Sequence, residues 1–152
     1  MELQEQLSKI GLIEGLTDEQ IANLMDICEL RKFQHEEKII SEITRTRDLY
    51  IIKTGSVSIS MCVPMEARKS EVIDRLHAGD MMGEIAFIDG SPRSASVHAE
   101  EETEVYVFPY DKIIALMEGD PKLGYVLISG IANILTAKIR QTNLAWRNLM
   151  MW

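Results

Sequence analysis

Apolar and polar residues alternate strictly in the segment that follows Gly55. Val57, Ile59, Met61 and Val63 are separated by serines and a cysteine. A two-residue period places successive side chains on opposite faces of an extended chain. This segment is therefore predicted to be a half-buried strand.

Shorter apolar runs bounded by polar clusters flank this segment on both sides. The further predicted strands are Ile39–Ile40, Leu49–Ile52, Glu71–Leu76, Ser94–Ala99 and Thr103–Phe108. The polar stretch from Pro64 to Ser70 predicts a hairpin loop ahead of the return strand. Short strands separated by turn signals favour a β-sandwich or a closed barrel over residues 30–108.

Helical patterns replace the strand pattern at both ends of the chain. Residues 1–29 are predicted to be helical, with Thr17 as a cap, Gln20 three residues later, and Leu16 and Ile21 placed to form a hydrophobic staple. Residues 109–152 are also predicted to be helical. A short helix from Pro109 to Met117 ends near Gly119, and a long helix begins at Asp120-Pro121 with a capping acid and a first-turn proline.

The long helix has an apolar stripe near a three-and-four spacing. Its members are Ile128, Ile131, Leu135, Thr142, Ala145, Leu149 and Trp152. A helix over residues 121–152 would be about 48 Å long, more than a small barrel can cover. We predict a homodimer through this helix that depends on Ile131, Leu135 and Leu149. The alternative is a helix that folds back over the barrel and buries the stripe within its own chain.

Charge and composition narrow the functional classes. The chain has 152 residues, a net charge of −8, 46% hydrophobic residues and 26% charged residues, which suits one domain with its own core. All 24 acidic residues lie in residues 1–120, whereas residues 121–152 hold four basic residues and no acid. Such an acidic surface argues against general attraction to nucleic acid or anionic membranes.

Several kinds of chemistry find no support in the sequence. Cys28 and Cys62 are too few for a disulfide framework, and free buried thiols in a cytoplasmic protein are expected. No leader pattern and no run of 18 apolar residues is present. The three histidines have no metal-ligand spacing, and no nucleophile stands beside an arranged base. We therefore expect no metal, no cofactor and no enzymatic activity.

The stretch from Gly79 to Val97 carries the most informative pattern. Gly83 suits close backbone approach, and the following residues to Ile88 are long enough for one helical turn, whose free N–H groups favour an anion. A turn and Pro92 then lead to Arg93, whose planar guanidinium matches a phosphate. The pattern predicts a small phosphate-binding cassette over residues 79–97, with Glu84 placed to accept sugar hydroxyls.

These residues resemble a known family. Gly79-Asp80, Gly83-Glu84, Ala86-Phe87 and Pro92-Arg93-Ser94-Ala95 are similar to the cassette of the cyclic nucleotide-binding domain, found in catabolite-activator-type regulators, cyclic-nucleotide-dependent kinases and gated channels. The resemblance implies a mainly β fold with flanking α-helices. It would be one domain over residues 1–152, an eight-stranded jelly-roll barrel with N-terminal helices and a long C-terminal helix.

The resemblance also implies roles for individual residues. Arg93 would pair with the cyclic phosphate, Glu84 would bind the ribose 2′-hydroxyl, and the N–H groups around Ile85 and Ala86 would complete the cradle. The further candidate ligand-binding residues are Gly83, Ser94, Met82, Ala95, Thr136, Lys138 and Arg140. Met82 stands where the family usually has an aromatic residue. Glu36 and Ile43 stand where it has turn glycines, which puts the geometry of those turns in question.

The leading hypothesis is a stand-alone sensor that binds cyclic AMP or cyclic GMP and couples the ligand to the C-terminal helix. One alternative is the sensor part of a longer transcription regulator, and another is a ligand-free dimerisation module. Because no helix-turn-helix follows before Trp152, we expect no DNA binding by this chain.

Overall fold

Eight strands and five helices make up the described part of the chain. The computed structural model describes residues 2–151, apart from the side chains of residues 67 and 68. The helices are α1 (Glu2–Lys9), α2 (Asp18–Asp26), α3 (Glu84–Asp89), α4 (Tyr110–Gly119) and α5 (Pro121–Met150). The strands are β1 (Glu29–Phe33), β2 (Lys38–Ile40), β3 (Leu49–Thr54), β4 (Ser56–Val63), β5 (Glu66–His77), β6 (Met81–Met82), β7 (Ser96–Ala99) and β8 (Thr103–Phe108).

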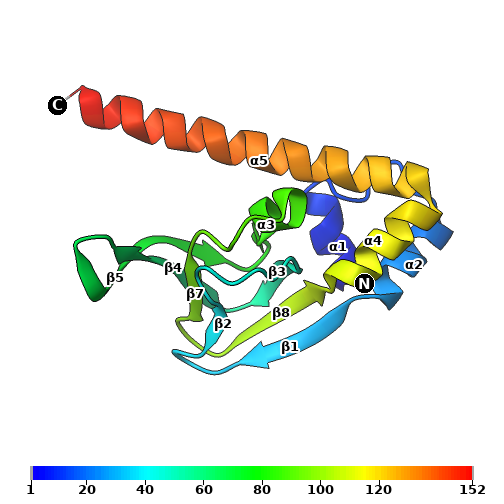
Figure 1. Ribbon diagram of the computed structural model, residues 1–152. Helices are drawn as coiled ribbons and strands as arrows, with labels where there is room; N and C mark the ends of the chain where they lie inside the picture. The colour runs from blue at the N-terminus through cyan, green and yellow to red at the C-terminus, as the bar shows by residue number, and fades with distance from the viewer. Residues whose placement is uncertain (1, 152) are drawn as a thin grey trace.

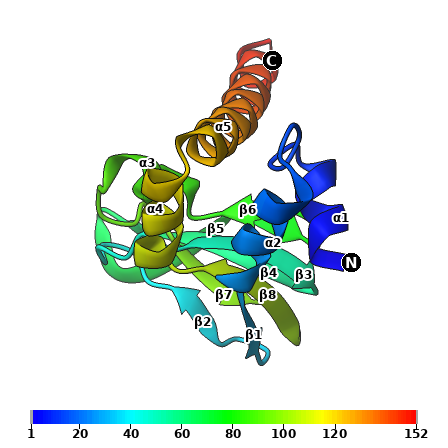
Figure 2. The ribbon, with the colours of Figure 1, turned by 90° about the vertical axis from the view of Figure 1, so that its right-hand side faces the viewer.

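The strands form two antiparallel sheets of four, in the orders β1-β8-β3-β6 and β2-β7-β4-β5. Figures 1 and 2 show the helices gathered on one side of the sheets, with α5 running across the top. The predicted mainly β class with flanking helices is thus confirmed. Within residues 2–151 no ladder joins the two sheets, so the sandwich is not closed into a continuous barrel.

Strand β3, inside the first sheet, is buried on both faces, which explains its uninterrupted apolar run. Tyr50 and Ile52 face the second sheet, together with Val57 and Val97 from that sheet. The alternate residues Leu49 and Ile51 face the helices instead. A strand covered on both sides has no polar face to show.

The capping residues predicted for the helices at both ends of the chain are confirmed. The Thr17 hydroxyl accepts from the Gln20 N–H at 3.2 Å, and the Gln20 side chain accepts from the Thr17 N–H at 2.9 Å, which completes the predicted capping box. Asp120 accepts from the Leu123 N–H at 3.2 Å at the start of α5. The predicted helical segment is two short helices, α1 and α2, because Gly11 and Gly15 take left-handed backbone angles between them. Its predicted end at residue 29 is wrong, because Glu29 already belongs to β1.

Two strands begin at least two residues away from their predicted starts. The return strand β5 begins at Glu66 rather than Glu71, so the hairpin loop shrinks to a turn at Pro64 and Met65. Backbone pairing in a projecting hairpin needs no apolar side chains, which is why the polar sequence there did not reveal the strand. Strand β7 begins at Ser96 rather than Ser94, because the preceding residues bend toward the cassette.

Cys62 also departs from expectation. The prediction that both thiols are buried is wrong for this residue, which is exposed on β4. Cys28 is half-buried, and burial raises the pKa of its thiol to about 12. The Cys28 thiol is therefore neutral and unreactive near pH 7.

Helix α5 packs on the domain with its first half and projects beyond it with its second half. Leu123, Leu127 and Ile131 are buried, and a side chain on Gly130 would lie 2.9 Å from the Gly11 carbonyl. Every residue from 139 to 151 is exposed. By length and composition alone α5 could also cross a bilayer, but a core helix of a domain meets the same criterion.

The stripe predicted for dimerisation needs a correction. Ile131 is 1% exposed and belongs to the core of its own chain, and Leu135 packs partly against that core. An overlapping stripe runs along α5 and is open to solvent except at the half-buried Leu135, and we call it the exposed seam. Its members, spaced alternately by three and four residues, are Tyr125, Ile128, Ala132, Leu135, Ile139, Thr142, Trp146 and Leu149.

The two positions where the family resemblance lacked glycine both take left-handed backbone angles. Glu36 has φ 68° and Ile43 has φ 74°. A β-branched residue is disfavoured there, and the Ile43 side chain is exposed, so it gains little packing in return.

We expect Ile43→Gly to raise the free energy of unfolding by about 1 kcal/mol, because glycine removes the steric strain at a smaller entropic cost. Urea unfolding of the wild type, Ile43→Gly and Ile43→Ala would measure this. The alanine variant keeps the strain and serves as the control. A glycine variant no more stable than the alanine variant would contradict the prediction.

Candidate functional site

Helix α3 and the loop after it form the cassette that the sequence predicted. Gly83 precedes the helix with φ 86° and Gly90 follows it with φ 68°. A Cβ atom on Gly83 would lie 2.8 Å from both Arg93 Nη1 and the Asp48 carbonyl, so only glycine fits. The N–H groups of Glu84, Ile85 and Ala86 have no protein acceptor among the described residues. They present unpaired donors at the start of the helix.

Arg93 is 4% exposed and lies at the end of the cassette. Its Nη1 donates to the Gly83 carbonyl at 3.0 Å, Nη2 to the Asp48 carbonyl at 2.9 Å, and Nε to Thr46 Oγ1 at 3.1 Å. A guanidinium has five N–H donors, so one N–H on each terminal nitrogen remains available. Burial lowers the pKa of Arg93, but the group stays charged.

No carboxylate pairs with Arg93 among the residues that the structure describes. Neither Glu84 nor Asp89, the acidic residues of the same cassette, forms an ion pair with it. A buried cation held by neutral groups is poorly compensated, which favours an anionic partner.

Three consecutive residues ahead of β3 hold the cassette in place. Thr46 and Asp48 position Arg93, as described above. Arg47 donates to the carbonyls of Ala86 at 3.0 Å and Phe87 at 2.8 Å, at the end of α3, and stacks 4.2 Å from the ring centre of Tyr110. The Asp48 carboxylate accepts from the Tyr110 N–H at 2.7 Å, at the start of α4. This segment thus connects the cassette with the C-terminal helices.

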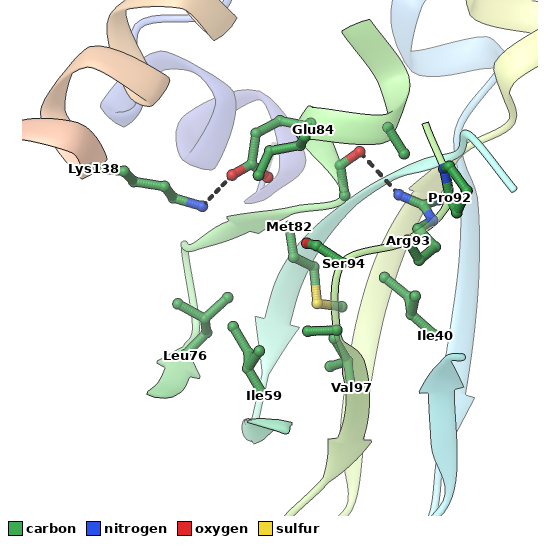
Figure 3. A pocket seen from close by; sticks show the side chains of 14 residues that line it. Ile40, Ile59, Leu76, Met82, Glu84, Pro92, Arg93, Ser94, Val97 and Lys138 are labelled. Carbon is green, nitrogen blue, oxygen red and sulfur yellow. Dashed lines mark hydrogen bonds and ion pairs between the residues drawn. The ribbon is translucent and has the colours of Figure 1, made fainter. Parts of the chain in front are cut away.

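Glu84 faces Lys138, which comes from α5. The distance from Lys138 Nζ to Glu84 Oε1 is 2.6 Å, and the same ammonium donates to the Met81 carbonyl at 2.9 Å. The Glu84 side chain is 6% exposed and that of Lys138 is 38% exposed. In Figure 3, Lys138 reaches Glu84 on one side of a cavity, and Arg93 lies on the other.

The cavity between these groups has a volume of about 120 Å³. Most of the predicted binding residues line it: Met82, Gly83, Glu84, Ile85, Ala86, Arg93, Ser94, Ala95 and Lys138. Thr136 and Arg140 do not line it. They lie on an exposed part of α5, and the Thr136 hydroxyl donates to the Ala132 carbonyl within the helix.

Sequence reasoning missed an apolar wall that the second sheet contributes to the cavity. Its members are Ile40, Ile59, Leu76 and Val97. Ile59 was visible as an inward residue of the alternating strand, but nothing in the sequence placed it beside the cassette. The roles of Thr46, Arg47 and Asp48 were also missed, because they depend on contacts with residues about 40 to 60 positions away.

The site therefore combines a buried arginine with two free donors, a short helix with open N–H groups, a carboxylate and an apolar wall. This geometry defines a sandwich domain that binds a small anionic ligand with an apolar part. Comparison with known families matches residues 30–120 to the cyclic nucleotide-binding domain. The chain belongs to this family.

Two relatives are similar to this chain in sequence. The chain is 29% identical over 120 residues to the cAMP-activated global transcriptional regulator CRP of Salmonella typhimurium, covering 78% of this chain and 56% of the regulator. It is 31% identical over 98 residues to the cAMP-dependent protein kinase regulatory subunit of Mycosarcoma maydis, covering 64% of this chain and 18% of that subunit. The chain thus spans little more than half of the regulator and a fifth or less of the subunit.

The fold has solved counterparts. A cyclic nucleotide-binding domain from Methylobacillus flagellatus superimposes with a TM-score of 0.81 at 28% identity, over 92% of this chain and 78% of that one. The Thermus thermophilus catabolite activator protein gives a TM-score of 0.74 at 22% identity, over 92% and 63% of the two chains. At 22% identity, the likeness to the Thermus thermophilus protein supports the fold alone.

Proposed function

We propose that this chain is a regulatory sensor that binds cyclic AMP or cyclic GMP in the cavity between α3 and the second sheet. The observation that carries the proposal is Arg93, a buried cation without a carboxylate partner among the described residues, which keeps one free N–H on each terminal nitrogen. Two free charged donors suit the oxygens of a cyclic phosphate. The N–H groups of Ile85 and Ala86 would add further donors to the same phosphate.

The remaining parts of the site suit the remaining parts of a nucleotide. Glu84, a buried carboxylate, would accept the ribose 2′-hydroxyl. The apolar wall with Ile59, Leu76 and Val97 would face the sugar and base. Ser94 is exposed at the rim and carries a hydroxyl suited to either the phosphate or a guanine base.

Substitution of Glu84 tests the ribose assignment. Wild type should bind the parent cyclic nucleotide roughly tenfold or more tightly than its 2′-deoxy analogue, because a hydrogen bond to a charged group contributes about 1.5–3 kcal/mol. Glu84→Gln should bind the parent more weakly and discriminate much less between the two. Calorimetric titration of both proteins with both ligands would measure the ratios. Equal affinity of wild type for the two ligands would show that Glu84 has another role.

A homodimer through the exposed seam is the second part of the proposal. The seam contains eight uncharged residues at alternating spacings of three and four, whereas Lys138, Arg140 and Arg147 lie off it. Ile139 is 60% exposed, and Leu149 is similarly open, on a half-helix that its own domain does not cover. A second copy of α5 would bury this stripe. Ligand-induced movement of α5 would then change the geometry of the dimer.

Two alternatives lead to different results in the same experiments. A ligand-free dimerisation module would form the dimer and bind neither nucleotide. The sensor part of a transcription regulator would bind ligand in the same way, and the chain covers about half of such a relative.

A further inference from the structure

The ion pair between Glu84 and Lys138 occupies the ribose side of the cavity. Lys138 is the one lining residue, within the part of the chain that the structure describes, that comes from α5; the others belong to the sheets and the cassette. Its ammonium contacts both Glu84 and the Met81 carbonyl, so two of its three donors are used. The side chain is thus fixed across the junction between helix and cassette.

The Glu84 carboxylate on this side of the cavity is already bonded to Lys138, at 2.6 Å. A ribose hydroxyl that binds the same oxygen has to take the place of the lysine. The cassette is held by Arg47, Asp48 and Thr46, and the apolar wall is part of a sheet. Lys138, by contrast, is 38% exposed and sits on a flexible four-carbon stem.

We propose that a cyclic nucleotide has to displace Lys138 from Glu84 before its ribose hydroxyl can bind there, so that this lysine lowers the affinity of the site. The inference rests on the proposed function. It also predicts a mechanical consequence, because Lys138 is the last residue of α5 that is not fully exposed. The contact of Lys138 with Glu84 thus acts as a tether between α5 and the cassette. Displacement of the lysine releases this tether next to the projecting half of the helix.

Lys138→Met tests the proposal, because methionine keeps a long stem and removes the charge. Affinity for the cyclic nucleotide should rise about tenfold, since the ligand no longer has to break a charged hydrogen bond of about 1.4 kcal/mol. Lys122→Met is the matched control. Lys122 is exposed near the start of the same helix, so its removal measures the general effect of losing one positive charge on the binding of an anion. A fall in affinity for Lys138→Met, or no change relative to the control, would overturn the proposal.

Hydrogen–deuterium exchange without nucleotide provides an arm that does not depend on the proposed function. Lys138→Met and Glu84→Gln break the same ion pair from opposite sides, so both should speed amide exchange in residues 132–142. Their effects on affinity should be opposite: the lysine variant binds more tightly and the glutamate variant more weakly. If neither wild type nor Lys138→Met binds a cyclic nucleotide, the proposed function and the displacement step are both rejected. Unchanged exchange in both variants would reject the tether even if nucleotide binds.

Discussion

Arg93→Leu is expected to reduce cyclic nucleotide affinity by at least about 100-fold. The variant removes two charged hydrogen bonds to the phosphate, which together contribute roughly 3 kcal/mol or more. It also removes the cation that compensates the charge of the ligand inside the site. Arg93→Lys should bind with intermediate affinity, because a lysine keeps the charge and loses the planar fork.

The structural role of Arg93 has to be separated from its role in binding. Its guanidinium also satisfies the carbonyls of Gly83 and Asp48, so the leucine variant should lose about 1–3 kcal/mol of folding free energy as well. Thermal unfolding would confirm that the variant is folded at the temperature of the titration. Arg45→Leu is the control, because Arg45 is exposed in the same connection ahead of β3. Binding by folded Arg93→Leu within tenfold of wild type would contradict the assignment.

Ile139→Asp is expected to convert the proposed dimer to a monomer. Two copies of the substitution would place two unpaired carboxylates in the centre of an apolar seam, at a cost of several kcal/mol. Ile139 lies beyond the part of α5 that packs on the domain, so the fold should be unaffected. Leu135→Asp would be a poorer test, because Leu135 also packs against the core of its own chain.

Gln141→Asp is the matched control for this prediction. It introduces the same carboxylate two residues away, at an exposed position on a different face of the helix. Sedimentation velocity at tens of micromolar protein would measure both variants and wild type. Monomeric wild type, or equal dissociation of both variants, would reject the exposed seam as the interface.

Local signals predicted local structure well. The Thr17–Gln20 capping box, the bounds of β8 at Thr103–Phe108 and the short helix α3 were all readable, because neighbouring residues determine them. The cassette was readable because its motif is contiguous.

Features that depend on distant parts of the chain could not be read in the same way. Glu84 and Lys138 are 54 positions apart, and only the path of α5 over the cassette brings them together. The choice between Ile131 and Ile139 as a seam residue depends on where the domain stops covering the helix. Helical periodicity places each of these residues on an apolar stripe. It does not show which stripe packs against the domain of the same chain and which stays exposed.

Calorimetric titration of wild-type protein with cyclic AMP and cyclic GMP tests the central claim most directly, with non-cyclic 5′-AMP as the control ligand. The account predicts saturable binding of at least one cyclic nucleotide, with one site per chain and clearly weaker binding of 5′-AMP. Absence of binding by both cyclic nucleotides at millimolar concentration would contradict the sensor function and favour the ligand-free dimerisation module.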